Sequence, residues 1–467
     1  MAGMILTADI GTSSLKAAFI DFNGHLRAFS RAAYPREPHS VIPWEQAFIR
    51  LLENLSAQAP GALIEGICIS GNGPTLAPVD RDGNTLPPLY WYDGRTVSPP
   101  GIVTLEGKEA PKPSSLFLPH AAWLKANAPE LYSKIRFFVS SHEWLASRLG
   151  AETLTVLPSP SYEPYYWDEE QCRLFGVDKE KFPPFVGMGE IIGQVSPEAA
   201  SFFGASSGNC LKSGIPIVAG APDFISALIG TGTLRPGDVC DRAGSSEGVN
   251  ICTAGRPSLA PVKGKGAEIR VLPHVREGFW NLSAVIPSSG SFFDWYRSIT
   301  GQDGRAYEDL LAELIPDAPD PEIFRRLEFF PRDGDLSSLI DSGTHSPFPI
   351  PHSPLAFGRS VLCAIGFSVR SALVSLETQG FPVKEMRVSG GQGKNRRWNQ
   401  LKADITGVSL LAGEISDGEL AGDAVLAATA CGAAADLETA AGAMIRFRET
   451  YTPMNSDFWG ELYNTIG

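Results

Sequence analysis

The chain has 467 residues, of which 43% are hydrophobic and 19% are charged, and its formal net charge is −13. This acidic balance argues against a nucleic-acid or anionic-membrane partner, because both require a basic surface. A chain of this length exceeds one ordinary hydrophobic core, so we expect two or more domains.

The seven cysteines lie far apart and form no C-x-x-C pair, so we expect neither a zinc centre nor a disulfide framework. Sparse cysteines of this kind favour a reducing, cytoplasmic setting. The N-terminus lacks the basic and apolar regions of a signal peptide, and no apolar run reaches the ~18 residues of a membrane span.

Two apolar runs near the N-terminus, residues 4–8 and 17–20, predict two strands of one sheet. The stretch between them reads D-I-G-T-S-S-L-K and begins at Asp9. Its glycine lets the backbone approach a ligand, and its hydroxyl and N–H groups could cup a phosphate. Lys16 adds a positive charge, and the Asp9 carboxylate could hold Mg²⁺ through water. A hairpin with a polar turn explains the same residues equally well.

The next glycine-rich turn, S-G-N-G-P-T at residues 70–75, follows an apolar strand predicted over residues 64–69. Ligands of open α/β sheets bind outside the carboxyl ends of the strands, so this turn is a candidate site. Farther along, Asp93 and Arg95 follow three aromatic residues. Such a pair could bind a small hydroxylated ligand, although an ion pair at the end of a strand is the simpler interpretation.

Asp223 lies where a strand predicted over residues 215–220 gives way to an apolar helix. A carboxylate at a helix N-terminus stabilises the helix by ~0.3–1 kcal/mol in any protein. An N-cap is therefore one interpretation of Asp223, and a general base at the mouth of the sheet is the other.

The theme of a strand, a polar turn and a strand recurs at residues 239–252, around a G-S-S turn at 244–246. The sequence S-S-G-S at 288–291 then precedes a helix, whose N-terminus is a ready anion site. A strand over residues 385–388 enters the turn G-G-Q-G-K-N at 390–395. Neither a Walker A loop nor a G-x-G-x-x-G motif is present. The repetition predicts two domains of the same fold, each with a phosphate-binding turn.

Taken in order, five of these motifs resemble those of the FGGY carbohydrate kinases, which are members of the actin-like ATPase superfamily. In that family, similar motifs supply a first phosphate site, a substrate stretch, the catalytic aspartate, a second phosphate site and an adenosine site. Their counterparts here, in the same order, are D-I-G-T-S at 9–13, Y-D-G-R at 92–95, G-A-P-D at 220–223, G-S-S at 244–246 and G-G-Q-G-K-N at 390–395. The resemblance extends from about residue 4 to about residue 432.

The resemblance implies an α/β chain of two actin-like (ribonuclease H-like) domains with a cleft between them. Residues 1–241 would form the N-terminal domain, which binds the sugar, and residues 242–467 the C-terminal domain, which binds the nucleotide. It also implies ATP- and Mg²⁺-dependent phosphorylation of a small sugar or polyol, with a ketopentose-like substrate favoured. We expect no nucleic-acid or membrane partner, and a homodimer is compatible with a kinase of this kind.

The resemblance also assigns roles to single residues. Asp223 would be the general base, and Asp9 would organise Mg²⁺. Asn72, Asp93 and Arg95 would face the substrate beside Asp223. The residues expected to contact phosphate groups or to border the nucleotide are Gly11, Thr12, Ser13, Lys16, Gly244, Ser245, Gly290, Gly391, Gln392 and Asn395.

Three departures from the family pattern bear on the substrate. Xylulokinases have G-Q-M-H-G where this chain has G-N-G-P-T at 71–75, so their substrate histidine is missing. Phe224 follows Asp223 where the family usually has Asn or Gln, and a phenyl ring cannot hydrogen-bond to a sugar hydroxyl. The loop at 330–358 lacks the usual G-E-R-type signature.

Two alternatives to a kinase follow from these departures. A catalytically idle sugar- or nucleotide-binding regulator on the same fold would explain the loss of polar groups at Pro74 and Phe224. The retention of Asp9, Lys16 and Asp223 favours an enzyme instead. An ATPase or chaperone of the same superfamily would need no sugar pocket, which the Asp93 and Arg95 stretch disfavours.

Overall fold

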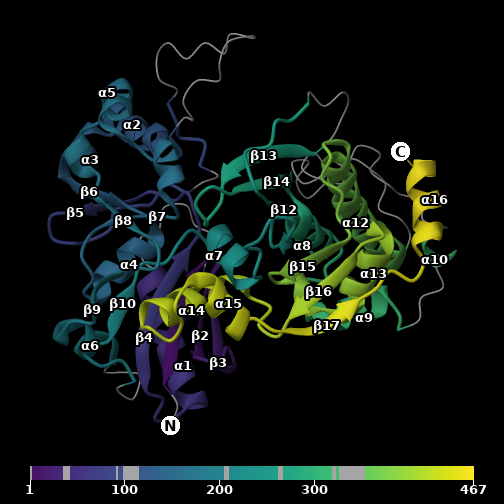
Figure 1. Cartoon of the computed structure of the whole chain (residues 1–467), viewed down its shortest axis with the longest axis horizontal. Helices are drawn as coiled ribbons and strands as arrows, with labels where there is room; N and C mark the ends of the chain where they lie inside the picture. Colours follow the sequence, from purple (N-terminus) through teal and green to yellow (C-terminus); the bar gives the residue numbers. More distant parts are fainter. Residues whose placement is uncertain are drawn as a thin grey trace. The chain divides into compact units, whose positions relative to one another are not determined.

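The computed structural model describes residues 3–34, 43–90, 93–97, 115–204, 210–260, 267–317, 322–325 and 353–466. Tyr92 and most of the loop at 330–358 lie outside this part of the chain. The chain forms two compact units (Figure 1). The first unit consists of Met1–Gly232, Pro273–Glu277 and Glu419–Ile445, and the second of Thr233–Leu272, Gly278–Gly418 and Arg446–Gly467. A segment near the C-terminus thus belongs with the first unit, which no local motif indicates.

A mixed sheet of six strands forms the centre of the first unit. Its strands are β1 (Met4–Ile10), β2 (Ser14–Asp21), β3 (Leu26–Ala33), β4 (Ile64–Gly71), β9 (Ile191–Gln194) and β10 (Pro216–Val218). Their order is β3-β2-β1-β4-β10-β9, in which β1, β4 and β10 run parallel to one another and the outer strands are antiparallel to their neighbours. The carboxyl ends of three adjacent strands therefore meet at one edge of the sheet.

The apolar sequence of β1 is buried from Ile5 to Ile10, as expected for a central strand that is covered on both faces. Helix α1 (Pro43–Gln58) packs its apolar side chains into this core with helical spacing. Helix α4 (Ser141–Leu149) begins at a capping box, in which the side chain of Ser140 and that of Glu143 each accept a backbone N–H of the first turn. These local signals fix the two helices on the sheet.

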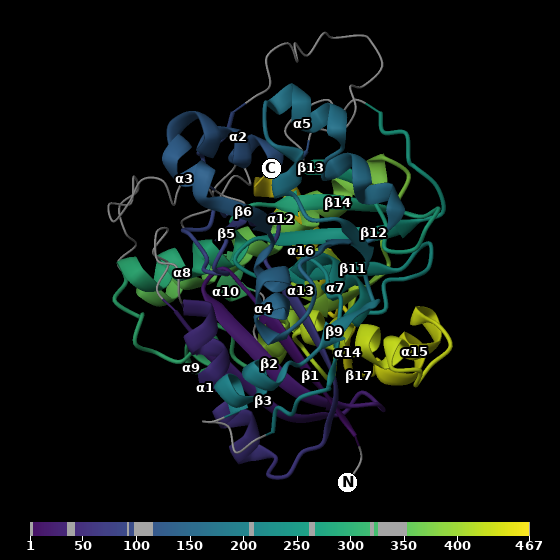
Figure 2. The same ribbon diagram turned by 90° about the vertical axis from the view of Figure 1, so that its left-hand side faces the viewer.

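Smaller elements complete the first unit. The antiparallel pair β5 (Ala77–Asp80) and β6 (Ile135–Val139) and the parallel pair β7 (Thr155–Leu157) and β8 (Phe185–Gly187) form two short sheets. Helices α2, α3 and α5 lie close together beyond them (Figures 1 and 2). The helices are α2 (Leu118–Asn127), α3 (Pro129–Lys134), η1 (Pro160–Tyr165), α5 (Glu169–Phe175), η2 (Lys179–Lys181), α6 (Pro197–Gly204), α7 (Asp223–Gly230), α14 (Gly418–Ala430) and α15 (Leu437–Met444).

The second unit contains a sheet of seven strands. They are β11 (Val239–Ala243), β12 (Glu247–Thr253), β13 (Glu268–Pro273), β14 (Trp280–Ile286), β15 (Glu385–Ser389), β16 (Ser409–Gly413) and β17 (Phe447–Tyr451). The order is β13-β14-β12-β11-β15-β16-β17, with β11 antiparallel to β12 and parallel to β15. The β11–β12 hairpin thus corresponds to the β1–β2 hairpin of the first unit, which is the repetition that the sequence predicts.

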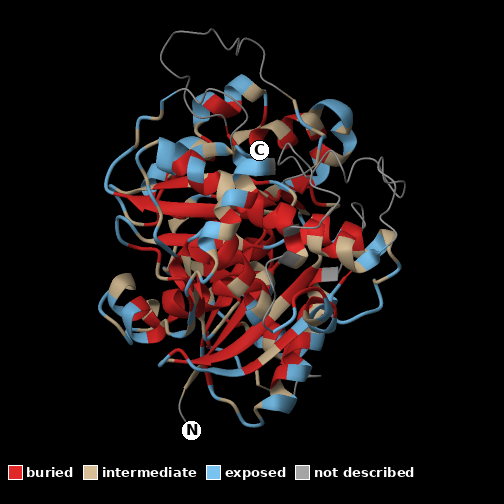
Figure 3. Cartoon of the chain, turned by 90° about the vertical axis from the view of Figure 1, so that its right-hand side faces the viewer, coloured by how far each residue is buried: buried red, intermediate tan, exposed pale blue. Residues whose placement is uncertain are grey.

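Helices cover the sheet of the second unit. They are α8 (Ser289–Ile299), α9 (Tyr307–Leu314), α10 (Glu322–Arg325), α12 (Pro354–Thr378), η3 (Gln392–Lys394), α13 (Arg396–Thr406) and α16 (Ser456–Ile466). Among the described helices, α12 alone is long and apolar enough to cross a membrane, although no uninterrupted apolar run was expected to reach that length. Of its most apolar stretch, 72% is buried. In Figure 3, buried residues are coloured red on the helices and strands. We therefore interpret α12 as a core helix.

Candidate functional site

The first candidate cluster lies in the β1–β2 hairpin of the first unit. Asp9 and Lys16 are strand residues directly opposite each other in the antiparallel register, and only Gly11 to Ser13 form the turn. The ammonium group of Lys16 lies 3.3 Å from Oδ2 of the buried Asp9 and 3.8 Å from Oε2 of Glu419 on α14. One cation and one carboxylate of the hairpin therefore lie beside the turn, together with a second carboxylate from α14.

The turn itself is tight, and hydrogen bonds from Tyr34 fix its backbone. The N–H of Gly11 donates to the Ser14 carbonyl at 3.0 Å, and a Cβ at Gly11 would lie 2.9 Å from that oxygen. The Tyr34 hydroxyl donates to the Gly11 carbonyl, and the Tyr34 N–H donates to the Ser13 carbonyl at 3.1 Å. Burial raises the pKa of Tyr34 well above its ordinary value, so this donor stays protonated. The backbone shape leaves Thr12 and Ser13 half-buried at the edge of the sheet.

Asn72 follows the carboxyl end of the neighbouring strand β4. Its N–H donates to the Ile10 carbonyl at 2.7 Å, which ties it to the end of β1. Its Oδ1 accepts hydrogen bonds from Ser141 at 3.1 Å and Thr75 at 3.3 Å. Its Nδ2 is buried and has no hydrogen-bond partner among the residues that the structure describes. The amide is thus fixed in orientation and retains a donor, which is what a hydroxyl-binding group needs.

Asp223 follows β10, the third parallel strand, and is the first residue of α7. The N-cap position belongs to Pro222, so the N-cap interpretation of Asp223 does not describe this helix start. The Gly71 N–H donates to the Ala221 carbonyl at 3.3 Å, and Gly73 packs against Pro222. Asp223 therefore emerges next to the turn that carries Asn72. Its half-buried carboxylate accepts the Phe224 N–H at 2.7 Å.

Asp93 and Arg95 form an ion pair, as the simpler interpretation of this stretch predicts. The guanidinium donates from Nε to Oδ1 at 2.9 Å and from Nη2 to Oδ2 at 2.5 Å. These hydrogen bonds hold the pKa of Asp93 below its ordinary value, against the effect of burial. The guanidinium also lies 5.3 Å from the ring centre of Trp123. A hydroxylated ligand would have to compete with this pairing.

Helix α14 of the first unit places two further carboxylates near this candidate site. Glu419 lies near Lys16, as described above, and Asp423 reaches Ser70 at the end of β4 and Ser226 on α7. None of the motifs in the sequence includes either residue. The available signal was the spacing of two acidic residues four positions apart in an alanine-rich run, which places them on one face of a helix.

The second candidate cluster lies in the second unit, where the Gly244 turn meets the N-terminus of α8. A Cβ at Gly290 would lie 2.2 Å from the Gly244 oxygen, so only glycine allows this approach. The N–H of Ser291 donates to the Ser245 carbonyl at 3.0 Å. The turn between β11 and β12 is thus docked on the first turn of a helix, whose N–H groups favour an anion.

The turn at 390–395 joins the same cluster. Gly390 has a φ of +94°, and a Cβ there would lie 2.4 Å from the Ala243 oxygen. The amide of Gln392 donates to the Gly244 carbonyl at 3.2 Å and to Ser289 at 2.9 Å. Space around Gly391 is open, because a Cβ at that position would meet no atom within 4 Å. The predicted nucleotide residues of the second unit therefore form one group, with open space beside Gly391.

Asn395 has a structural task in this group. Its Oδ1 accepts the Trp398 N–H at 3.0 Å and so caps α13. The Trp398 indole N–H in turn donates to Gln392 Oε1 at 3.0 Å. The predicted contact between Asn395 and a nucleotide would have to use the remaining amide group.

A cluster of buried charged residues lies next to the second candidate cluster. The sequence motifs did not predict it. Lys402 on α13 donates to Asp241 at 2.8 Å and to Glu247, which also accepts from Ser289. Burial and the neighbouring Glu247 raise the pKa of Asp241 above its ordinary value in spite of Lys402. Burial alone would lower the pKa of Lys402, but the two carboxyls raise it above its ordinary value. This cluster ties β11, β12, α8 and α13 together behind the Gly244 turn.

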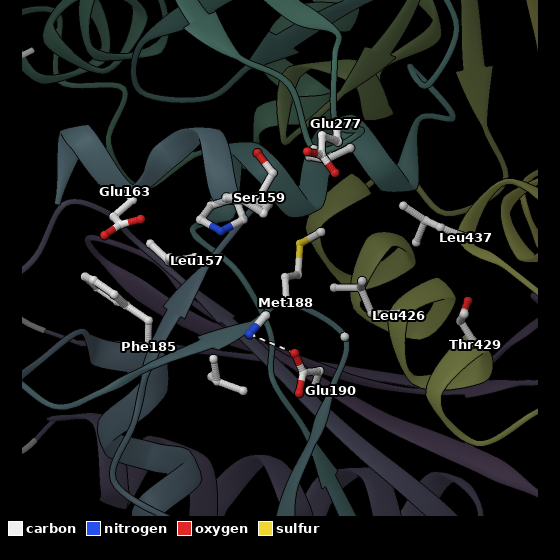
Figure 4. A pocket seen from close by; sticks show the side chains of 16 residues that line it. Leu157, Ser159, Glu163, Phe185, Met188, Glu190, Glu277, Leu426, Thr429 and Leu437 are labelled. Carbon is white, nitrogen blue, oxygen red and sulfur yellow. Dashed lines mark hydrogen bonds between the residues drawn. The ribbon is translucent and has the colours of Figure 1, made fainter.

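A pocket of about 610 Å³ lies elsewhere in the first unit, between the β7–β8 pair and α14 (Figure 4). Met188 and Leu426 point into its centre, and Glu163, Glu190 and Glu277 lie around it. Its lining includes none of the predicted site residues. Among the described residues, no group of three or more His, Cys, Asp or Glu side chains is placed to hold a metal.

Comparisons with known proteins show the family to which this chain belongs. The model of the FGGY carbohydrate kinase N-terminal domain matches residues 4–230, and that of the C-terminal domain matches residues 242–431. The chain belongs to the FGGY family of carbohydrate kinases. It is therefore a phosphotransferase by family, which confirms the resemblance drawn from the motifs.

Relatives of this FGGY kinase carry several names. The xylulose kinase of Lactococcus lactis subsp. lactis is 26% identical over 98% of this chain and 95% of its own length. The autoinducer-2 kinase of Yersinia enterocolitica is 22% identical over 96% of this chain and 90% of its own length.

Solved structures show the fold. A Brucella ovis structure described as a xyloylose kinase has a TM-score of 0.74 at 21% identity, covering 99% of this chain and 98% of its own. Plasmodium falciparum glycerol kinase with ADP has a TM-score of 0.69 at 18% identity, covering 100% and 98%. The expected α/β fold with two actin-like domains is confirmed.

Proposed function

We propose that this kinase transfers the γ-phosphoryl group of ATP to a hydroxyl of a small sugar or polyol, that a ketopentose is the favoured substrate, and that Asp223 is the general base. The observation that carries the proposal is the shared position of three polar side chains. Asp9, Asn72 and Asp223 each lie at or just beyond the carboxyl end of one of three adjacent parallel strands. Ligands of α/β sheets bind at this edge.

The residues of the first unit supply what phosphoryl transfer requires. Asp223 accepts the proton of the attacking hydroxyl as the oxygen bonds to the γ-phosphorus, and the bond to the bridging oxygen breaks with its electron pair going to ADP. Lys16 and the N–H groups of Thr12 and Ser13 offset the charge on the transferring group. The orphan amide donor of Asn72 orients a substrate hydroxyl.

The donor set also fits a magnesium ion bound with the nucleotide. Mg²⁺ is commonly held by one or two carboxylates together with water and substrate phosphates, and Asp9 offers one buried carboxylate beside the turn. When bound, Mg²⁺ neutralises charge on the β- and γ-phosphates. In the second unit, the Gly244 turn, the α8 N-terminus and the turn at 390–395 are the proposed nucleotide contacts.

The preference for a ketopentose rests on the relatives. The xylulose kinase of Lactococcus lactis is 26% identical to this chain. Solved structures of a gluconate kinase and a glycerol kinase share the fold as well. Phe224 beside Asp223 presents a ring rather than an amide, which favours a substrate with a C–H face or a missing hydroxyl there.

The test is a panel of D-xylulose, D-ribulose, D-gluconate and glycerol with ATP and Mg²⁺, measured by ADP release. We expect the highest kcat/KM with a ketopentose, and Asp223→Asn should lower kcat by about 10²–10⁴-fold with ATP affinity unchanged. Near-parental turnover by Asp223→Asn would remove Asp223 from the role of base. Tight sugar binding without turnover of any substrate would favour the regulator.

A further inference from the structure

We propose that Asp423 is a positioning residue, which holds the helix that carries Asp223 and the strand that leads to Asn72 in one fixed arrangement. This inference rests on the proposed function. Asp423 lies on α14 and is completely buried. Its Oδ2 accepts the Ser70 hydroxyl at 2.8 Å and the Ser70 N–H at 3.1 Å, and its Oδ1 accepts the Ser226 hydroxyl at 2.9 Å. One side chain therefore joins three segments of the first unit.

The two serines connect Asp423 to the proposed site. Ser70 lies in β4 two residues before Asn72, and Ser226 lies on α7 three residues after Asp223. Residues three apart on a helix share a face, so a displacement of Ser226 moves Asp223 with it. The distance between Asp223 and Asn72 thus depends on the hydrogen bonds that the Asp423 carboxyl group makes with the two serines.

The backbone is shaped to allow this bridge. Gly422 precedes Asp423, and a Cβ at Gly422 would lie 1.9 Å from the Ser226 carbonyl oxygen and 3.1 Å from the Gly230 nitrogen. Helices α14 and α7 are therefore in backbone contact, which brings the short Asp423 side chain within reach of Ser226. One helical turn earlier, Glu419 lies near Lys16, so the same face of α14 approaches the phosphate turn as well.

Packing alone does not account for a carboxyl group at this position. Burial raises the pKa of Asp423 well above its ordinary value, and the hydrogen bonds from Ser70 and Ser226 offset this only in part. An apolar residue would avoid the desolvation of the carboxyl group. An apolar residue could not accept hydrogen bonds from β4 and α7 at the same time. These directional hydrogen bonds fix the rotation of α7 and its distance from the sheet.

The experiment compares Asp423→Ala, Asp423→Asn and Ser226→Ala with the parent, using D-xylulose or whichever sugar of the panel the parent phosphorylates best. Turnover is expressed per ATP-binding site, titrated calorimetrically, so that unfolded protein does not count. Because a displacement of about 1 Å at a reacting group costs up to ~100-fold, Asp423→Ala should lower kcat by about 10–100-fold with the KM for ATP nearly unchanged. Ser226→Ala removes one bond only and should lower kcat by a smaller factor in the same direction.

Asp423→Asn should restore most of the activity. The amide oxygen can accept the Ser70 N–H while the amide group donates to the Ser226 hydroxyl, which can turn to accept. The matched control for Asp423→Ala is Asp404→Ala, which removes a buried carboxyl of the second unit that accepts the Met454 N–H at 2.8 Å and the Gln400 amide at 2.9 Å. It should reduce stability and leave kcat per site close to the parent.

Two results would overturn the inference. One is parental kcat per site in both Asp423→Ala and Ser226→Ala, and the other is a loss in Asp423→Asn as large as that in Asp423→Ala. Either result, obtained with an active parent and an inactive Asp223→Asn, would refute the positioning role alone. An Asp223→Asn variant with parental turnover would instead refute the proposed base, and the positioning role with it.

Discussion

Replacing Gly290 by alanine should weaken nucleotide binding through a single steric contact. Gly290 is the second residue of α8, and a Cβ there would lie 2.2 Å from the Gly244 oxygen, 3.1 Å from the Gly244 carbonyl carbon and 3.2 Å from the Ser245 Cα. All three atoms belong to the backbone, so no side-chain rotation relieves the contact. The turn between β11 and β12 must retreat by roughly 1 Å to regain an ordinary van der Waals distance.

The magnitude follows from two opposing effects. Overpacking of this kind costs about 1–3 kcal/mol, whereas replacing glycine by alanine inside a helix gains ~1 kcal/mol. The net loss of stability is then at most about 2 kcal/mol, and the variant should fold. If the Gly244 turn contacts phosphate groups, its displacement by about 1 Å should lower kcat/KM for ATP by up to ~100-fold.

The assays are the kcat/KM for ATP, calorimetric titration with a non-hydrolysable ATP analogue and Mg²⁺, and the thermal midpoint of each protein. Gly442→Ala on α15 is the matched control, because a Cβ at that position would meet no atom within 4 Å. It should leave binding at the parental value and raise the midpoint slightly, because the gain of ~1 kcal/mol is not offset by a contact. Parental affinity in Gly290→Ala would refute the assignment of the Gly244 turn to the nucleotide.

Two further predictions concern buried charge. Lys402→Met leaves the carboxyls of Asp241 and Glu247 without their cation, so urea denaturation should show a loss of about 3–5 kcal/mol, whereas the control Lys125→Met, whose side chain is 39% exposed, should lose less than ~1 kcal/mol. An equal effect in both variants would contradict the account of the cluster. Burial lowers the pKa of His142 to about 3, so below the ordinary value of ~6.5 the unfolded chain binds a proton that the folded protein does not. As the pH falls from 7 to about 4.5, the parent should therefore lose roughly 2–3 kcal/mol of stability relative to His142→Leu, measured by urea denaturation at each pH. Parallel pH dependence of the two proteins would show that His142 is not shifted.

The sequence indicated those parts of the fold that local patterns determine. The β1–β2 and β11–β12 hairpins follow from apolar runs on either side of short polar turns, and the start of α7 follows from the change of periodicity after β10. The same reasoning located the glycine turns of the second unit, because positions such as Gly290 and Gly390 admit no side chain. Backbone geometry of this kind can be predicted from the local sequence, because it requires glycine at particular positions.

The contacts that the sequence did not reveal join residues far apart in the chain. Asp423 and Ser70 are 353 positions apart, and Lys402 and Glu247 are 155 positions apart. Neither pair has a spacing that a helix or a hairpin would impose, so their pairing depends on how the sheets and helices pack. Asp93 and Arg95 show the converse, since their closeness in sequence predicted an ion pair that the structure confirms.

Phosphorus NMR of the reaction mixture tests the central proposal most directly. Parent protein, ATP, Mg²⁺ and D-xylulose should give the signals of ADP and of a new sugar phosphomonoester in equal amounts, and Asp223→Asn should give neither over the same time although it binds ATP. Release of inorganic phosphate without a phosphomonoester for every sugar of the panel, or equal product from Asp223→Asn, would contradict the proposal.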